Sequence, residues 1–258
     1  MLGRVVEEVR RRAPLVHCLT AAVSMNFVAD ALHAAGAKPM MTETVEEAPV
    51  MTGIADALLI NLGTLSTDGM AGIPATVARA AELGTPWVLD PTAVGVAPIR
   101  TPLARELLRH RPAVIRGNAS EVLNLAGAGS GGRGAEASNT TDEAGDAAER
   151  LAREVGTVVA VSGPADLITD GRRRATVTAG DPLLTLVTGT GCALGALTAA
   201  CVAVSDPFTG AHAATAWLCL AAEEAARTTR GPGSFKVGLV DSLSLMDTEL
   251  VDRTGRRG

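Results

Sequence analysis

Cys192 stands where a glycine-rich turn meets a long apolar segment, in the stretch TLVTGTGCALGALTAACVAV that begins at Thr185. The residues Gly189, Thr190 and Gly191 before it predict a tight turn whose backbone N–H groups open a helix. Because a helix amino terminus concentrates unpaired donors and positive partial charge, this turn suits an anion hole for a phosphate or a developing anion. Glycines let the backbone approach that anion closely. A plain turn before a buried helix is the alternative interpretation.

The position of Cys192 also predicts chemistry for its thiol. A helix amino terminus stabilises the thiolate, which can act as a base or a nucleophile. The alternative is a small core residue, the usual fate of a free cysteine and the one that we expect for Cys201 and Cys219 on their apolar helices. The four cysteines show no C-x-x-C spacing, which argues against a disulfide framework or a structural zinc site and favours reduced thiols.

Arg116 and Glu121 lie in the stretch VIRGNASEVLNLAG, where a predicted strand passes into a helix. Asn118 and Glu121 have the spacing of a capping box, in which both side chains bond to backbone N–H groups at the start of the helix. The carboxylate can also point back toward the strand ends and hold water around Mg²⁺, beside Arg116 as a phosphate ligand. The two roles of Glu121 are compatible.

Two further polar side chains end apolar strands. Asp90 closes WVLD, and Ser162 closes VVAVS. Ligands of open α/β sheets bind at the carboxyl ends of the strands, so Asp90 is a candidate ligand for a metal or a substrate and Ser162 a candidate nucleotide contact. Turn formation is the alternative role for both. We interpret His17, near the end of the first predicted strand, as a buried histidine with satisfied hydrogen bonds.

Short apolar runs that favour strands alternate along the chain with longer helical patterns. This alternation is typical of βα units, which build a parallel sheet with helices on both faces. The runs ALLINL, WVLD and TVVAVSG are continuously apolar, as strands buried on both faces are. DLITDG and RRATVTAG predict a hairpin, and three helical stretches are expected after it. The predicted fold class is α/β with a mostly parallel central sheet.

Length and composition narrow the class of protein. A chain of 258 residues fits a single domain, 1–258, and GAGSGGRGAEASNTTDE, which begins at Gly127, predicts a mobile surface loop inside it. The net charge of −5 argues against a nucleic-acid or anionic-membrane partner, because both require clustered cations. The charged amino terminus and the lack of a long apolar run predict a cytoplasmic protein that acts on a small molecule.

Taken together and in this order, the motifs INLGTL, VLDP, VIRGNASE, PLLTLVTGTGC and GPGSF resemble those of the hydroxyethylthiazole kinase family, in the ribokinase-like superfamily. The resemblance runs from Pro14 to Leu243. It implies a ribokinase-like fold and a homotrimer with active sites between subunits. It also implies Mg²⁺-dependent transfer of the γ-phosphoryl group of ATP to the hydroxyl of 4-methyl-5-(2-hydroxyethyl)thiazole, in thiamine biosynthesis or salvage.

The resemblance also implies roles for single residues. It places thiazole contacts at Met41 and Gly189. It places ATP contacts at Arg116 and at Ser162, where the family more often has threonine.

Three more positions match the metal and base sites of the superfamily. Glu121 matches the Asn-x-x-Glu motif associated with magnesium, and Asp90 lies where a second acidic group near the metal is expected. Most ribokinase-like enzymes have an aspartate base after the glycine motif, whereas this family has cysteine, as here at Cys192.

The sequence departs from the family pattern at Ala21 and Ala22, where the family has Thr-Asn followed by Asn or Tyr, and in DPTAVGVAP, where Asp-Pro-Val-Gly is usual. Because an amide near the thiazole is lost, the first alternative function is that of a ribokinase-like kinase that acts on another small heteroaromatic alcohol. A hydrolase or acyltransferase with Cys192 as nucleophile would need a histidine partner, which no local pattern supplies. A nucleotide-binding regulatory protein would keep the fold without turnover.

Overall fold

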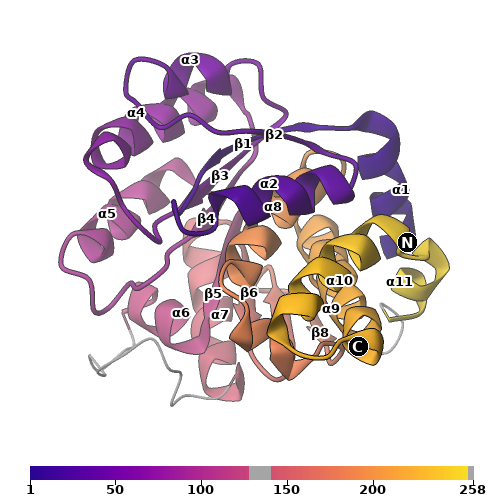
Figure 1. The fold of residues 1–258 in the computed structure, drawn as a ribbon. Coiled ribbons are helices and arrows are strands. Elements are labelled where there is room, and N and C mark those ends of the chain that lie inside the picture. The colour runs from indigo at the N-terminus through magenta and orange to yellow at the C-terminus, as the bar shows by residue number, and fades with distance from the viewer. Residues whose placement is uncertain (128–140, 255–258) are drawn as a thin grey trace.

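The computed structural model describes residues 1–127 and 141–254, which form one eight-stranded sheet between two layers of helices (Figure 1). The strand order is β2-β1-β3-β4-β5-β6-β7-β8. Neighbouring strands from β2 to β6 pair in parallel, whereas β7 and β8 run antiparallel to their neighbours. The predicted α/β class with a mostly parallel sheet is therefore confirmed, and so is the hairpin, which is β7–β8.

The strands are β1 (Leu15–Leu19), β2 (Lys38–Met40), β3 (Ala57–Asn61), β4 (Trp87–Asp90), β5 (Val114–Asn118), β6 (Val158–Ser162), β7 (Asp166–Thr169) and β8 (Arg174–Val177). The α-helices are α1 (Leu2–Arg12), α2 (Met25–Ala34), α3 (Ala48–Thr52), α4 (Thr67–Leu83), α5 (Arg100–Leu107), α6 (Ala119–Leu125), α7 (Thr141–Val155), α8 (Thr190–Val202), α9 (Pro207–Thr228), α10 (Pro232–Leu245) and α11 (Thr248–Thr254). Two 3-10 helices are η1 (Leu108–His110) and η2 (Pro182–Leu186).

The central strands are buried on both faces, as their continuous apolar runs predict. Along β3, Leu58 and Ile60 face the core under α4 to α7, while Ala57 and Leu59 face the core under α1, α2 and α8 to α11. This division follows from the two-residue period of a strand. Helices therefore cover both faces of the sheet, and a ligand can reach it only at the ends of the strands.

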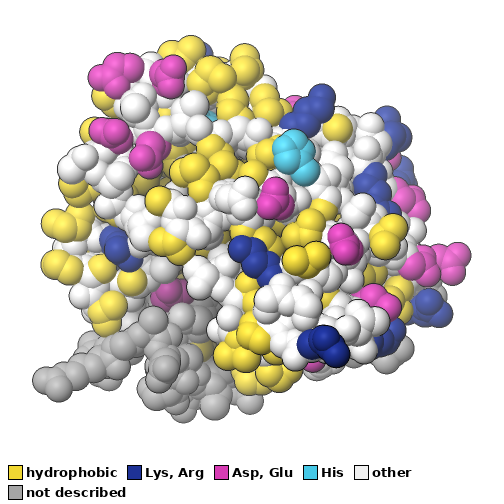
Figure 2. All heavy atoms as spheres, in the orientation of Figure 1, with side chains coloured by type: hydrophobic (Ala, Val, Ile, Leu, Met, Phe, Trp, Pro, Cys, Tyr) yellow, Lys and Arg dark blue, Asp and Glu magenta, His cyan; other side chains and the backbone are white. Residues whose placement is uncertain are grey.

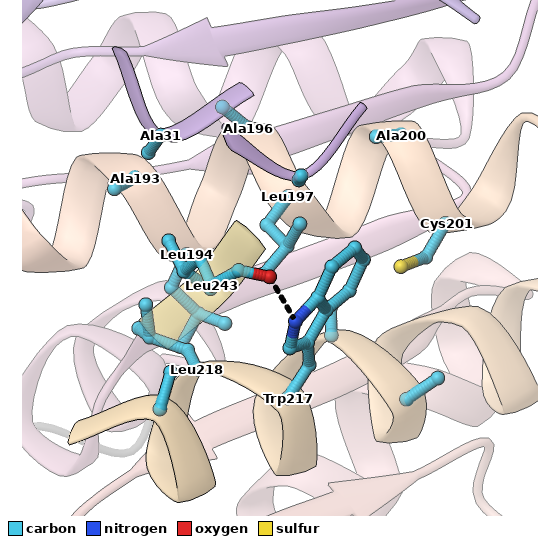
Figure 3. Close-up of a cluster of buried hydrophobic side chains, with 14 of the residues drawn as sticks. Ala31, Ala193, Leu194, Ala196, Leu197, Ala200, Cys201, Trp217, Leu218 and Leu243 are labelled. Atoms are coloured by element: carbon cyan, nitrogen blue, oxygen red, sulfur yellow. Dashed lines mark hydrogen bonds between the residues drawn. The ribbon is translucent and has the colours of Figure 1, made fainter. Parts of the chain in front are cut away.

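Helix α8 runs through the apolar layer on the second of these faces. All of its residues from Ala193 to Val202 are buried, and a helix that is apolar all round belongs in a core. Figure 3 shows it packed against α9, where the indole N–H of Trp217 donates to the backbone oxygen of Leu243 at 3.1 Å. Cys201 lies in the same cluster, as predicted. This packing holds the amino terminus of α8 in place.

One expectation for the carboxyl-terminal part was wrong. Within the described residues, the 3-10 helix η2 and four α-helices, α8 to α11, follow the hairpin, whereas three helices were expected. Helix α11 has a polar sequence, TELVDRT, with Val251 as its buried residue, and it packs against α1. A seven-residue helix with one core contact leaves no periodic signal in the sequence.

Of the predicted mobile loop, residues 128–140 lie outside the described residues. Among the helices that the structure describes, none has both the length and the apolar character that crossing a membrane requires.

Candidate active site

The carboxyl ends of β3, β4, β5 and β6 lie side by side and bring four polar side chains to one edge of the sheet. Asn61 pairs in register with Asp90, and Asn118 pairs with Ser162. Arg116 precedes Asn118 by two residues on β5 and so points to the same face of the sheet. The parallel topology alone therefore gathers the predicted candidates Asp90, Arg116 and Ser162.

The amino terminus of α8 closes this edge. Gly189 is its N-cap, with φ at 97°, and the first bond of the helix runs from Ala193 N–H to Gly189 O at 2.8 Å. The N–H groups of Thr190, Gly191 and Cys192 come before that bond, so the helix itself gives them no partner. The Thr190 hydroxyl fixes the turn by donating to the backbone oxygen of Leu184 at 2.8 Å. The predicted turn and its free donors are thus present, although the anion itself remains a prediction.

Arg116 lies at the centre of the site. Its Nη1 donates to Asp90 Oδ2 at 3.2 Å and its Nη2 to Ser162 Oγ at 2.9 Å, while its buried Nε finds no partner among the described residues. A Cβ added to Gly191 would lie 3.1 Å from Nη1, so the guanidinium rests against the first turn of α8. A cation and a helix amino terminus together make this point strongly attractive for phosphate.

Asp90 is almost completely buried, with 2% of its surface exposed. Besides the Arg116 bond at Oδ2, its Oδ1 accepts from the Thr92 hydroxyl at 3.0 Å. The carboxylate therefore does two things that the sequence left open, because it shapes the turn after β4 and also faces the site. Its part in holding a metal stays a prediction.

Glu121 forms the capping box that the Asn-x-x-Glu spacing predicts. Its Oε2 accepts from Asn118 N–H, and Asn118 Oδ1 accepts from Glu121 N–H, both at 2.9 Å. The second oxygen reaches across to the turn after β4, where Oε1 accepts from Ala93 N–H at 3.0 Å. Ala93 has a φ of 67°, which is uncommon for alanine. Glu121 therefore also anchors a strained turn, in the segment DPTAVG that differs from the family pattern.

The electrostatics of Glu121 show that it is close to a second negative charge. Burial, and then the charge of Asp90, raise the pKa of Glu121 against the hydrogen bonds from Asn118 and Ala93. Two neighbouring carboxylates resist ionising together unless a cation lies near them. Within the described residues, no cluster of three or more His, Cys, Asp or Glu side chains could hold a metal, so this pair would need ligands from elsewhere.

Cys192 contacts the site from the α8 side. Asn61 Nδ2 donates to its sulfur at 3.5 Å. Burial, and then the charge of Asp90, raise the pKa of the Cys192 thiol. Burial and the charge of Asp90 therefore oppose the stabilisation of the thiolate that the helix end predicts. The raised pKa keeps the thiol protonated near neutral pH, so Cys192 is better suited to orienting a hydroxyl than to removing its proton.

A cavity of about 630 Å³ opens beside Arg116 and Ser162, between the β7–β8 hairpin and helices η2, α8 and α9. Its walls are mainly aliphatic and come from different segments; they include Pro164, Ala179, Leu184, Leu194 and Leu218. A pocket of this size, apolar inside and cationic at one end, suits a nucleoside with its phosphates at the mouth.

The cavity also contains Asp166, a residue that the sequence reasoning missed. Asp166 Oδ1 accepts from Gly163 N–H at 3.0 Å, and Oδ2 accepts from the thiol of Cys219 at 3.4 Å. This fixes the turn that carries Ser162. Cys219 is buried as predicted, yet it also lines the cavity. The signal available in the sequence was an acidic residue directly after the β6 turn.

Asn61 was missed as well, although it ends an apolar strand as Asp90 does. The two residues predicted to contact thiazole, Met41 and Gly189, lie beside β2 and α2. Met41 directly follows β2 and is half-buried against the core, and Gly189 packs on α2 beside Ser24. His17 is buried and bonded to Thr52 Oγ1 at 2.8 Å, as predicted.

Comparison with known proteins gives the family of this chain. The chain matches the hydroxyethylthiazole kinase family over residues 6–249. It is 47% identical over 254 residues to a hydroxyethylthiazole kinase of Cereibacter sphaeroides, an alignment that covers 98% of this chain and 97% of the relative. A solved hydroxyethylthiazole kinase structure from Pyrococcus horikoshii superposes with a TM-score of 0.90 at 39% identity, over 97% and 95% of the two chains.

A pyridoxal kinase of Staphylococcus aureus, solved with AMP-PCP and pyridoxal, superposes with a TM-score of 0.61 over 81% of this chain and 86% of its own. At 18% identity this likeness concerns the fold alone, and it agrees with the ribokinase-like architecture that the motifs implied. The match over residues 6–249 and the identity of 47% to a relative aligned over nearly its whole length show the family as well as the fold. The chain belongs to the hydroxyethylthiazole kinase family.

Proposed function

We propose that this protein is a single-domain cytoplasmic kinase that transfers the γ-phosphoryl group of ATP to the hydroxyl of hydroxyethylthiazole. The observation that carries the proposal is the meeting of Arg116, Cys192 and the amino terminus of α8 at one edge of the sheet, beside an apolar cavity. The names of the close relatives support this choice of substrate.

The donor side of the reaction uses the cavity. The nucleoside of ATP enters between the hairpin and α9, and its phosphates meet Arg116, the Ser162 hydroxyl and the N–H groups of Thr190 and Gly191. Phosphoryl transfer depends mostly on positioning and on neutralising charge on the equatorial oxygens. A buried guanidinium and a helix end supply both.

Asp90 and Glu121 fit a Mg²⁺ ion that arrives with the nucleotide. Each carboxylate oxygen accepts one hydrogen bond and keeps a second lone pair, and burial together with the charge of Asp90 raises the pKa of Glu121. Magnesium in kinases is held by one or two carboxylates, while phosphates and water complete its shell. The ion would neutralise phosphate charge; Asp90 and Glu121 would fix its place.

The acceptor side lies at the α2 and β2 side of α8. The thiazole ring contacts Met41 and Gly189, and its hydroxyl reaches the sulfur of Cys192. The hydroxyl oxygen bonds to the γ-phosphorus as the bond to the bridging oxygen of ADP breaks; ADP keeps the electron pair of that bond, and the hydroxyl proton passes to water. Because the pKa of the thiol is raised, Cys192 mainly orients the hydroxyl.

The assembly is a homotrimer in which a neighbouring subunit completes the acceptor side. Val50 and Ile54 are 70% and 65% exposed, and Leu83 lies beside them; we call these three side chains the α3 patch. Figure 2 shows hydrophobic side chains gathered over α3 at the top of the molecule. The segment that starts at Met41 leads directly into α3, so a subunit docked on this patch comes close to the thiazole contacts.

The test is an assay of ATP consumption with Mg²⁺ over a panel of small heteroaromatic alcohols, with ³¹P detection of the phosphate ester. Hydroxyethylthiazole should give the highest kcat/KM. A better substrate elsewhere in the panel would favour the first alternative, since Ala21 and Ala22 lack the family's amide. A Cys192-dependent hydrolase is disfavoured because the contacts described for Cys192 include no histidine.

A further inference from the structure

Asn61 ends β3 inside the site, and the rest of the structure fixes which way its amide points. The side chain is 4% exposed. Its Oδ1 accepts from Gly63 N–H at 2.8 Å, a group that can only donate. A Cβ at Gly63 would lie 2.7 Å from the Cβ of Ala21, so this turn has no freedom to move away. The oxygen of the amide is thereby assigned, and its nitrogen must face the opposite way.

The amide nitrogen has two protons and two acceptors. One acceptor is the Cys192 sulfur and the other is Thr92 Oγ1, each 3.5 Å from Nδ2. Thr92 donates its own proton to Asp90 Oδ1, so its oxygen is free to accept. The sulfur, in turn, accepts from Asn61 and must direct its S–H proton elsewhere.

We propose that Asn61 is a positioning residue that orients the Cys192 thiol toward the acceptor hydroxyl. This inference rests on the proposed kinase function. The amide is the link in a continuous set of hydrogen bonds that joins the Arg116–Asp90 pair, through Thr92, to the sulfur on α8. The phosphate side and the hydroxyl side of the site are thereby held in one fixed relationship, which phosphoryl transfer requires.

A merely structural role for Asn61 would leave a different signature. The bond to Gly63 N–H stabilises the turn after β3 whether or not residue 192 carries a thiol. The bond to the sulfur matters only when the thiol is present. A double-mutant cycle separates the two, because the structural loss is the same in both backgrounds and cancels.

The experiment measures kcat for hydroxyethylthiazole in the wild type, Asn61→Ala, Cys192→Ala and the double variant. Asn61→Ala should lower kcat about tenfold in the wild type and less than about twofold beside Cys192→Ala, the scale of one hydrogen bond. An equal loss in both backgrounds would overturn the inference. Thermal unfolding of each variant shows that it is folded.

A second measurement needs no turnover and so stands apart from the kinase function. Asn61→Asp keeps the acceptor for Gly63 N–H but replaces the donor to sulfur with an oxygen. The pH midpoint for iodoacetamide labelling of Cys192 should rise by about one unit, because a donor to the thiolate is lost and a negative charge is gained. An unchanged midpoint would overturn the inference. Cys192→Ala supplies the blank for labelling of the buried thiols of Cys18, Cys201 and Cys219.

A wild type that labels as expected but phosphorylates no alcohol would refute the proposed function alone. A wild type that is active, with no coupling between Asn61 and Cys192, would refute the positioning role alone.

Discussion

Arg116 Nη1 lies 3.2 Å from Asp90 Oδ2, and the side chains of this ion pair are only 13% and 3% exposed. Removing one partner of a buried pair leaves the other charge without compensation, which costs about 3–5 kcal/mol. The same ion pair therefore stabilises the folded protein and forms part of the candidate active site.

Arg116→Met should lower the free energy of unfolding by about 3 kcal/mol, because Asp90 is left as an unpaired buried charge. Adding Asp90→Asn should recover most of that stability without restoring turnover, since the phosphate ligand is still missing. Urea denaturation and the KM for ATP measure the two effects. Equal stability of the single and double variants would show that Arg116 does not compensate the buried charge of Asp90.

Cys192→Ala should lower kcat at least about tenfold while the KM for the alcohol changes less than about threefold, because the thiol acts on the hydroxyl at the reacting stage. Cys201→Ala is a matched control, since Cys201 lies on the same helix but is buried in the core. It should lose some thermal stability and keep its turnover. Wild-type kcat in Cys192→Ala would remove the thiol from the mechanism.

Asp166→Asn should change how stability depends on pH. Burial raises the pKa of Asp166, against the bonds from Gly163 and Cys219. A carboxyl with a raised pKa in the folded state holds its proton more tightly there than in the unfolded chain. Its contribution to stability is complete below the unfolded value of about 4 and is lost as the pH rises through the folded value.

The wild type should therefore lose stability relative to Asp166→Asn as the pH rises from about 4 to about 7. The variant keeps the shape of the side chain and an oxygen for Gly163 N–H. Urea unfolding at three pH values in this range measures the difference. A difference that is constant with pH would show that Asp166 titrates alike in both states.

The α3 patch should decide the oligomeric state. Val50→Asp combined with Ile54→Asp places two charges on this surface, and a buried interface does not accept unpaired charges. Light scattering should then give a monomer, with the wild type a trimer. Leu245→Asp, at a position 82% exposed near the end of α10, is the control and should remain trimeric. A trimer in all three proteins would place the interface elsewhere.

Much of the fold and part of the site could be predicted because the signals are local. Continuous apolar strands that alternate with helices predict a parallel sheet, and the carboxyl ends of its strands must share an edge. For that reason Asp90, Arg116 and Ser162 were expected together and lie together. The capping box at Asn118 and Glu121 is local as well, and its spacing alone predicts it.

The remainder depends on packing between distant segments. Asn61 meets Cys192 across 131 positions of sequence, a contact that exists because α8 packs over β3. The thiol shows the same limit, since its helix-end position predicts a stabilised thiolate, whereas its burial and the charge of Asp90 raise its pKa. Local patterns give the type of side chain at a site, while its protonation depends on the neighbours that the fold supplies.

The two glycines of the turn before Cys192 should respond differently to alanine. Gly189 has a φ of 97° and its Cβ would lie 2.9 Å from the Cβ of Ser24, so Gly189→Ala should lower Tm through strain of about 1–3 kcal/mol. Gly191 is helical, and the three heavy atoms nearest to its Cβ would all belong to the guanidinium at the far end of Arg116, the closest at 3.1 Å. Gly191→Ala should therefore lower Tm less than Gly189→Ala does and raise the KM for ATP by shifting the guanidinium. Loss of Tm in Gly191→Ala with an unchanged KM would show that the turn serves folding instead of phosphate binding.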